Sequence, residues 1–167
     1  MLRSNHDLKR QQQVQQYKNQ IQTDKIIKRI LIISPEEDVN LALKTALEQV
    51  EGDATSSSGS GGYNFRVECF NNPVLALKNF KNGLYDLLIA DVIMPQINGF
   101  DLAEEVKKID QNVRVCFLIA GEIPGKLRAN QFIVEEEGYE DKFIQIPIEN
   151  NNLIRHVGIL IDSRTVR

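Results

Sequence analysis

The chain alternates between short apolar runs and longer stretches whose apolar residues recur at helical spacing, and this alternation constrains its fold more than any other feature. The apolar runs predict strands at residues 28–33, 64–70, 85–90, 113–120 and 141–146. Sequences as apolar as "LLIA", residues 87–90, are typical of strands buried on both faces. Helices on both faces of a parallel sheet provide such burial, so the sequence predicts a doubly wound α/β domain.

A helix is predicted after each strand. After the first strand, Pro35 suits a first helical turn, and the acidic residues 36–38 favour the positive end of a helix dipole. Apolar residues then recur at helical spacing from Val39 to Val50. The remaining helices are predicted at residues 72–83, 99–110 and 149–162, with a weaker one within 123–138.

Three segments differ in composition from this alternating region. Residues 1–25 are rich in Gln, with a thin apolar stripe at Leu8, Val14, Tyr17 and Ile21, so they predict a polar N-terminal extension that is either helical or disordered. Residues 51–62, "EGDATSSSGSGG", are rich in Gly and Ser and so predict a flexible loop insertion, and the strand that follows them argues against a phosphate-binding loop. Residues 164–167 are predicted to form a tail.

Charge and hydropathy argue against several classes of function. The 20 basic and 23 acidic residues give a net charge of -3, which does not favour direct DNA binding. Residues 164–167 are also too few for a DNA-binding helix-turn-helix. The N-terminus has no apolar signal region and the chain has no long apolar run, so we expect a cytoplasmic protein without a membrane span.

Asp91 directly follows the third apolar run. In doubly wound sheets the functional crevice lies beyond the carboxyl ends of the strands, and the third strand would bring Asp91 to that edge. By itself, such an aspartate could equally close a turn or cap a helix. The residues that follow it favour a chemical role.

Residues 87–108, "LLIADVIMPQINGFDLAEEVKK", resemble the core of response regulator receiver domains. Asp91, Met94, Pro95 and Gly99 match the family's D-x-x-M-P-x-x-x-G signature, and the resemblance extends over residues 28–163. It implies a receiver-like domain at residues 26–163 and a flavodoxin-like sheet of five parallel strands in the order 2-1-3-4-5. It also implies that Asp91 is in the position of an aspartate that accepts a phosphoryl group from a histidine kinase.

The same resemblance implies partners that this chain lacks. Receiver domains hold Mg²⁺ with an acidic pair after the first strand, and they contact the phosphoryl group with a hydroxyl after the fourth strand and a lysine after the fifth. The residues at these positions are Ser34 and Pro35 for the acidic pair, Ile119 (or Ala120 after a shift of one residue) for the hydroxyl, and Ile146 for the lysine. Glu36 could still reach the mouth of the pocket. We therefore expect an atypical receiver, or pseudo-receiver, with no catalytic residue and with weak or no Mg²⁺ binding.

The sequence leaves three functions open. The first is a non-enzymatic interaction module with a degenerate pocket, in which apolar neighbours raise the pKa of Asp91 unless Ser34 or the backbone compensates. The second is a working receiver phosphorylated on Asp91. The third, a flavin or nucleotide binder of the same topology, lacks a phosphate-binding loop.

For an interaction module, the resemblance implies a contact surface at about residues 124–163. Its partner would be a signalling protein, either a histidine kinase or a downstream target, or a second copy of the chain. Phe143 lies three residues before Ile146, where receivers often carry a switch aromatic. An ordinary core aromatic is an equal alternative for Phe143.

Overall fold

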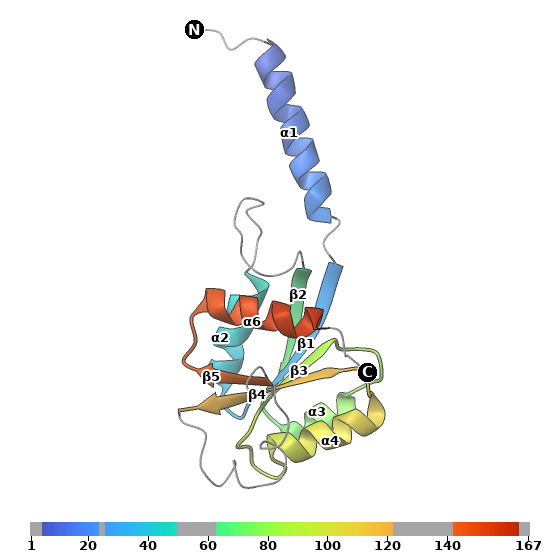
Figure 1. Ribbon diagram of the computed structural model, residues 1–167, viewed down its shortest axis with the longest axis vertical. Coiled ribbons are helices and arrows are strands. Elements are labelled where there is room, and N and C mark those ends of the chain that lie inside the picture. The colour runs from blue at the N-terminus through green and yellow to red at the C-terminus, as the bar shows by residue number, and fades with distance from the viewer. Residues whose placement is uncertain (1–4, 24–25, 50–62, 122–141, 164–167) are drawn as a thin grey trace.

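The computed structural model describes residues 5–23, 26–49, 63–121 and 142–163. Parallel strands form a single five-stranded sheet in the order β2-β1-β3-β4-β5, which confirms the predicted topology (Figure 1). The strands are β1 (Ile26–Ile33), β2 (Tyr63–Phe70), β3 (Leu87–Asp91), β4 (Arg114–Ala120) and β5 (Phe143–Ile146).

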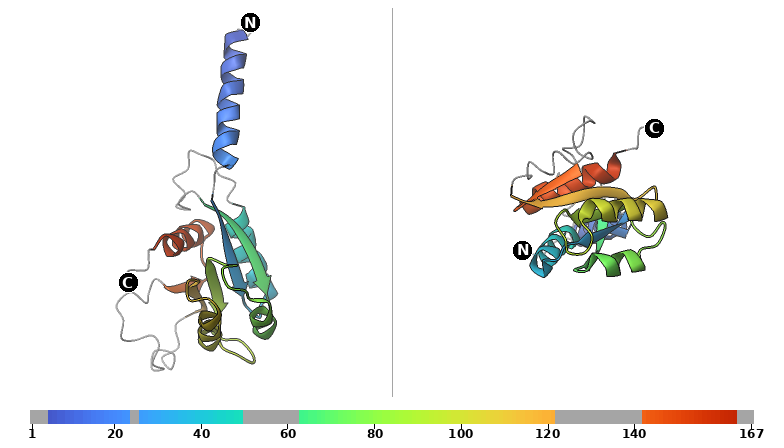
Figure 2. Two further views of the ribbon diagram at one scale, coloured as in Figure 1. Left: turned by 90° about the vertical axis from the view of Figure 1, so that its right-hand side faces the viewer. Right: turned by 90° about the horizontal axis from the view of Figure 1, so that it is seen from below.

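Helices cover both faces of the sheet, as predicted (Figure 2). They are α2 (Glu37–Glu48), α3 (Pro73–Asn79), α4 (Gly99–Ile109) and α6 (Asn150–Asp162). Helices α2 and α6 bury their apolar residues on one face, and α3 and α4 bury theirs on the other. The weaker helix expected within 123–138, the insertion at 51–62 and the tail at 164–167 all lie outside the described residues.

Two helix boundaries differ from the sequence prediction. Pro35 precedes α2 instead of occupying its first turn, because Glu36 is the extended N-cap residue and the helix begins at Glu37. Helix α3 ends at Asn79, four residues before the predicted stop at Gly83. Its end is set by Phe80, which leaves the helix and buries its ring 5.6 Å from the ring of Tyr85. Tertiary packing, not the glycine, therefore ends this helix.

Strand β1 begins two residues earlier than predicted and extends beyond its neighbour β3. It pairs with β2 along its whole length, from Ile26 opposite Tyr63, but it pairs with β3 only from Ile30 onward. The first residues are therefore ordered by backbone pairing and not by burial, and the side chains of Ile26 and Ile27 are 61% and 55% exposed. Hydrophobic periodicity locates a strand by its buried residues, so it did not predict the exposed start of β1.

Residues 5–23 of the N-terminal extension form helix α1 (Asn5–Thr23). In both figures this helix stands clear of the sheet and of the other helices (Figures 1 and 2). Leu8 and Val14 are accordingly 45% and 50% exposed. Within the described ranges, none of the helices combines the length and the hydrophobicity that a bilayer crossing requires.

Asp110 anchors the connection between α4 and β4. Its carboxylate is 2% exposed and accepts hydrogen bonds from the backbone N–H groups of Gly83, at 2.8 Å, and Asn112, at 2.9 Å. These bonds, chiefly the one from Gly83, hold the pKa of Asp110 below its usual range. The charged carboxylate therefore stabilises the fold above the unfolded-state pKa of about 3.9, and this contribution is lost as the pH falls through the lower folded-state pKa.

We expect Asp110→Ala to lower the free energy of unfolding by about 1–3 kcal/mol at pH 7, because two amides lose their acceptor. Urea unfolding measured at pH 7 and pH 3 checks this, and the difference from the wild type should shrink at the lower pH. Glu104→Ala, at an exposed acid in the middle of α4, is the matched control and should change stability by less than about 0.5 kcal/mol. An equal loss at both pH values would contradict the role of the Asp110 charge.

Candidate functional site

Asp91 is the last residue of β3, at the carboxyl edge of the sheet, and its side chain is half-buried. Its backbone pairs with Leu118 of β4. One carboxylate oxygen, Oδ1, accepts a hydrogen bond from the N–H of Ile93 at 3.0 Å. The other, Oδ2, accepts one from the Ser34 hydroxyl at 3.3 Å. The structure thus brings Asp91 and Ser34 into direct contact across β1 and β3.

The loop after Asp91 is tied back to the sheet and leads directly into α4. The N–H of Val92 donates to the carbonyl of Leu118, and the N–H of Gly99 donates to the carbonyl of Val92, both at 3.1 Å. The Asn98 side chain caps α4 by accepting from the N–H of Asp101 at 2.9 Å. A Cβ on Gly99 would lie 2.4 Å from the carbonyl oxygen of Asp91. The glycine of the signature therefore allows the start of α4 to sit against the backbone of Asp91.

Ser34 is fully buried, and its hydroxyl links two parts of the site. While donating to Asp91, it also accepts a hydrogen bond from the N–H of Glu36 at 3.3 Å. Serine is thus a polar partner of Asp91, although it replaces an acid that the family resemblance places here. The sequence analysis named Ser34 and the backbone as groups that could compensate Asp91, and both contact its carboxylate.

Asn40, a residue of α2, contacts the backbone beside Ser34, and the sequence did not single it out. Its side chain is 5% exposed, and its amide donates to the carbonyls of Ser34, at 2.9 Å, and Phe70, at 3.2 Å. It therefore fixes the ends of β1 and β2 relative to α2. A signal was present in the sequence, because Asn40 is three residues before Leu43 and seven before Leu47, on the apolar stripe of the helix.

Partial burial is the main influence on the pKa of Asp91. Burial raises the pKa of this carboxyl above its usual value, and the nearby carboxylate of Glu36 raises it further. The hydrogen bonds from Ile93 and Ser34 act in the opposite direction without cancelling the effect of burial. Because the folded-state pKa is raised, proton binding stabilises the fold below the unfolded-state pKa, and this stabilisation is lost as the pH rises through the folded-state pKa.

We expect Asp91→Asn to be at least as stable as the wild type at pH 7 and to lose this advantage near pH 3.5. An asparagine keeps an acceptor for Ile93, can donate to Ser34, and removes a charge that burial and Glu36 disfavour. Asp91→Ala is the control, because it leaves both donors without an acceptor and should cost about 1 kcal/mol. Thermal unfolding across this pH range checks the pair. A large destabilisation by Asn at pH 7 would show that the charge has a stabilising partner.

Ile119 and Phe143 belong to an apolar cluster beside the site. Ile119 is 5% exposed and packs with Val92 and Phe117, and Phe143 packs against the same cluster. The ring of Phe117 lies 5.6 Å from that of Phe143 and 4.6 Å from that of Phe100 in α4. Phe143 is therefore partly buried against the core, and Ile119 offers an apolar side chain where the resemblance expects a hydroxyl.

Ile146 ends β5 and pairs with Ala120, the last residue of β4. Its side chain packs against the core beneath α2 and α6, and a cis peptide bond joins it to Pro147. Both alternatives for the hydroxyl position, Ile119 and Ala120, are therefore apolar, as is the position of the lysine. Pro35, the last of the predicted pocket positions, lies partly buried between β1 and α2.

This arrangement provides few ligands for Mg²⁺. Among the described residues, no group of three or more His, Cys, Asp or Glu side chains is arranged so that it could hold a metal ion. The carboxylate of Glu36 lies close enough to raise the pKa of Asp91. Mg²⁺ prefers near-octahedral oxygen ligation, so two carboxylates with waters could hold it only weakly.

Sequence comparisons identify what the chain resembles. A family model for the response regulator receiver domain matches residues 30–156. The chain is 28% identical over 92 residues to the response regulator receiver protein CpdR of Brucella abortus, covering 55% of this chain and 66% of that protein. It is 35% identical over 77 residues to the probable transcriptional regulator ycf29 of Porphyra purpurea, covering 42% and 37%. The chain thus spans less than two thirds of the length of these relatives.

Solved structures give the same fold. The non-phosphorylated HemR receiver domain from Leptospira biflexa superimposes with a TM-score of 0.56 at 24% identity, covering 84% of this chain and 98% of that one. A response regulator receiver domain protein from Clostridium thermocellum gives a TM-score of 0.56 at 19% identity, covering 80% and 94%. At these identities the likeness establishes the fold alone.

Proposed function

This chain belongs to the response regulator receiver family of two-component signalling, and on that premise we propose that it is a pseudo-receiver that signals through protein contacts. In this proposal it is not an enzyme, and Asp91 is not readily phosphorylated. One observation supports the proposal above all others. Among the described residues, the groups that hydrogen-bond to the carboxylate of Asp91 are a serine hydroxyl and a backbone amide, both of them neutral.

The missing charges matter because of the chemistry of phosphoryl transfer. A carboxylate that attacks a phosphoryl group meets a centre already surrounded by negative oxygens, so catalysis depends on cations placed around it. Here Ser34 and Pro35 replace the acidic pair that would hold Mg²⁺, and Ile146 replaces the lysine. Each lost electrostatic contact to the transferring oxygens is typically worth about 2.7–4 kcal/mol in the transition state. Losing even one slows labelling by about a hundredfold.

The alternative is a functional receiver phosphorylated on Asp91. The close approach of Gly99 to Asp91 favours it, because the backbone around the aspartate keeps the tight packing that the family signature implies. Glu36 also lies close enough to influence the charge of Asp91. These features preserve the position of Asp91 as a phosphoryl acceptor, but they supply no positive charge to assist the transfer.

We expect incubation with acetyl phosphate and Mg²⁺ to leave the intact mass of the protein unchanged. A phosphoryl group on Asp91 would add about 80 Da, and Asp91→Asn provides the matched blank. The experiment requires a standard receiver treated in parallel, to show that the phosphodonor is active. Mg²⁺-dependent labelling that is absent from Asp91→Asn would replace the pseudo-receiver proposal with the alternative.

The proposed output is docking of a signalling protein, either a histidine kinase or a downstream target, on the face formed by about residues 124–163. Residues 142–163 of this face are described, and they include β5 and α6. Arg155 is exposed on α6, so Arg155→Glu should weaken such a complex without affecting the core. The absence of direct DNA contacts and the cytoplasmic location remain predictions from composition.

A further inference from the structure

A groove of about 450 Å³ opens between α2 and the segment that joins β5 to α6. Ala42 and Leu43 line it from α2, and Ala120, Ile146 and Ile148 line it from the carboxyl ends of the last strands. Most of its other lining residues are apolar as well. An open apolar groove of this size is suited to the side chains of a helix laid along it.

The rim of the groove is acidic. Asp38 lines it directly and follows Glu37 in the first turn of α2. Glu149, the N-cap residue of α6, lies beside the lining residues Ile148 and Asn150 on the other bank. All three acids are exposed. A helix that fits this groove should therefore combine apolar residues with positive charge.

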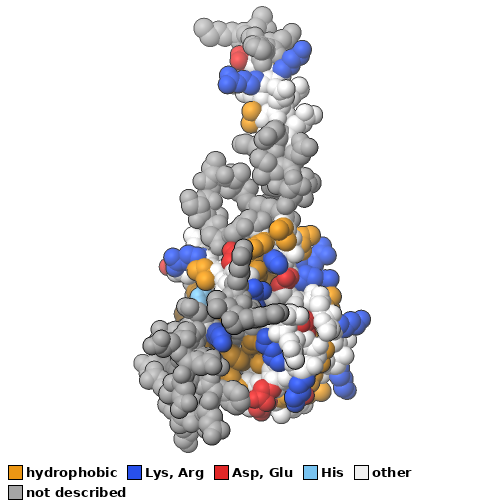
Figure 3. All heavy atoms as spheres, turned by 45° about the vertical axis from the view of Figure 1, so that its right-hand side comes forward, with side chains coloured by type: hydrophobic (Ala, Val, Ile, Leu, Met, Phe, Trp, Pro, Cys, Tyr) orange, Lys and Arg blue, Asp and Glu red, His pale blue; other side chains and the backbone are white. Residues whose placement is uncertain are grey.

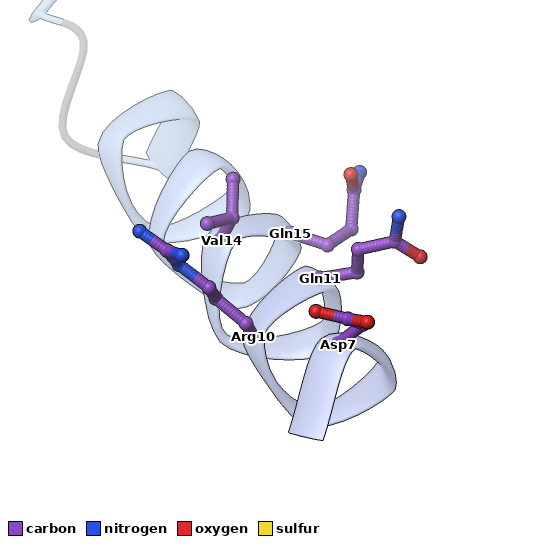
Figure 4. Close-up of a pocket in the computed structure, with 5 residues that line it drawn as sticks. All are labelled: Asp7, Arg10, Gln11, Val14 and Gln15. Carbon is purple, nitrogen blue, oxygen red and sulfur yellow. The ribbon is translucent and has the colours of Figure 1, made fainter. Parts of the chain in front are cut away.

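Helix α1 has these properties, and among the described residues no other element covers it (Figure 1). It carries the basic residues Lys9, Arg10 and Lys18 against a single acid, Asp7. Figure 4 shows Arg10 extending to one side of α1, Gln11 and Gln15 to the other, and Val14 between them. Arg10, Val14, Tyr17, Lys18 and Ile21 recur at the spacing i, i+4, i+7, i+8 and i+11, which places their positions along one helical face. A lone helix of this length is marginal in water, so a covering surface would stabilise it.

The length of α1 and the position of the groove favour a second copy of the chain as the domain that covers α1. Helix α1 leaves the domain at the amino edge of the sheet, whereas the groove is at the carboxyl edge. Its 19 residues span about 28 Å, slightly more than the roughly 26 Å of the eight-residue strand β1. If two copies met at their amino edges, each α1 could therefore run along the other domain as far as its groove.

The amino edge itself carries apolar surface that such a meeting would cover. Ile26 and Ile27, at the start of β1, are 61% and 55% exposed. Figure 3 shows hydrophobic side chains at the surface where α1 joins the domain. A helix folded back onto its own groove would bring no second amino edge to this surface. An exchange between two copies covers both the groove and the amino edge.

We propose that the chain forms a reciprocal dimer in which α1 of each copy lies in the groove between α2 and α6 of the other. The exchange is closed by a two-fold axis, so both grooves are filled and the assembly stops at two copies. Because α1 enters from the amino edge, its amino-terminal half reaches the groove, with Val14 toward the groove floor and Arg10 toward the acidic rim. This association does not require phosphorylation of Asp91 and is independent of the fate of that residue.

Sedimentation velocity on the full chain tests the proposal. We expect a monomer–dimer equilibrium whose dissociation constant rises with salt, because screening weakens the contacts between the basic helix and the acidic rim. Val14→Asp should weaken the dimer by about tenfold or more, since it puts a charge into an apolar contact. Gln15→Asp is the matched control, because it adds the same charge at the neighbouring position, on the side of α1 away from the groove, and should change the dimer much less.

Groove variants test the other half of the contact. Ala42→Lys should weaken the dimer, whereas Leu41→Lys, at a neighbouring exposed residue that does not line the groove, should not. Arg10→Glu and Asp38→Lys should each weaken the dimer, and the double variant should recover part of the loss. Thermal unfolding checks that the α2 variants fold, and the α1 variants keep the test valid if one of them does not.

Two results would overturn the proposal. One is a chain that stays monomeric at every concentration, which would mean that α1 covers its own groove or serves another partner. The other is a dimer that is indifferent to both Val14→Asp and Ala42→Lys, which would place the interface elsewhere.

Discussion

Gly99→Ala is expected to lower the free energy of unfolding by about 3 kcal/mol or more, or to prevent folding altogether. The added Cβ would lie 2.4 Å from the carbonyl oxygen of Asp91 and 3.1 Å from the Cα of Val92. The nearest atoms it meets belong to the backbone, so no side chain can rotate away to make room. The start of α4 would have to move off the end of β3, breaking the hydrogen bond from the N–H of Gly99 to the carbonyl of Val92.

The helix propensity of alanine offsets only a small part of this destabilisation. Alanine is a better helix former than glycine by up to about 1 kcal/mol, and Gly99 is the first residue of α4. Gly83→Ala is the control, because Gly83 has a φ of +72° but a Cβ added there would meet no atom of the described residues within 4 Å. It should cost only the backbone strain of about 1–2 kcal/mol. Urea unfolding of both variants, with NMR shifts of the Ile93 amide as a local probe, separates a clash at Asp91 from general glycine loss. Equal costs at both glycines would contradict the close-approach argument.

Periodicity in the sequence predicted a doubly wound α/β domain and the place of Asp91, whereas the strand order came from the resemblance to receiver domains. A run as apolar as residues 87–90 is typical of a strand in a parallel sheet that helices cover on both faces. An acid that directly follows such a strand lies at the carboxyl edge of the sheet. The start of β1 was missed because Ile26 and Ile27 are ordered by pairing with β2 while remaining exposed. Periodicity reports burial, so it does not register strands that extend into solvent.

The local chemistry of the site was less predictable. Whether a serine after a strand touches an aspartate on another strand depends on side-chain directions that spacing does not specify. Ser34 proved to be a hydrogen-bond donor to Asp91, and Asn40 proved to fix the corner from α2. The groove beside Ile146 could not be predicted from the sequence, since its lining residues come from α2, β4, the end of β5, the segment after it and α6. The sequence shows that these positions are apolar, but it does not show that their side chains leave a groove between them.

Restoring the family's ligand set should recover phosphorylation of Asp91 by acetyl phosphate. The variant combines Ser34→Asp, Pro35→Asp, Ile119→Thr and Ile146→Lys, and we expect its labelling rate to exceed that of the natural chain by at least about a hundredfold. The two new acids would provide Mg²⁺ ligands beside Asp91, and the threonine and lysine would contact the transferring oxygens. The same variant with Asp91→Asn should remain unlabelled.

Mg²⁺ binding gives this experiment a second readout that does not depend on chemistry. Ser34 is fully buried against Asp91, so an aspartate in its place sets two carboxylates side by side without a compensating charge. The restored variant should therefore be less stable than the natural chain in a chelator, and Mg²⁺ should raise its melting temperature, because the ion binds the folded state. If Mg²⁺ stabilises the variant but Asp91 is still not labelled, the ligand set alone does not account for the inactivity. The apolar packing of Phe143 against Phe117 beside the site would then be the next contact to relax, because it lies at the end of β4 beside the residues that the variant changes.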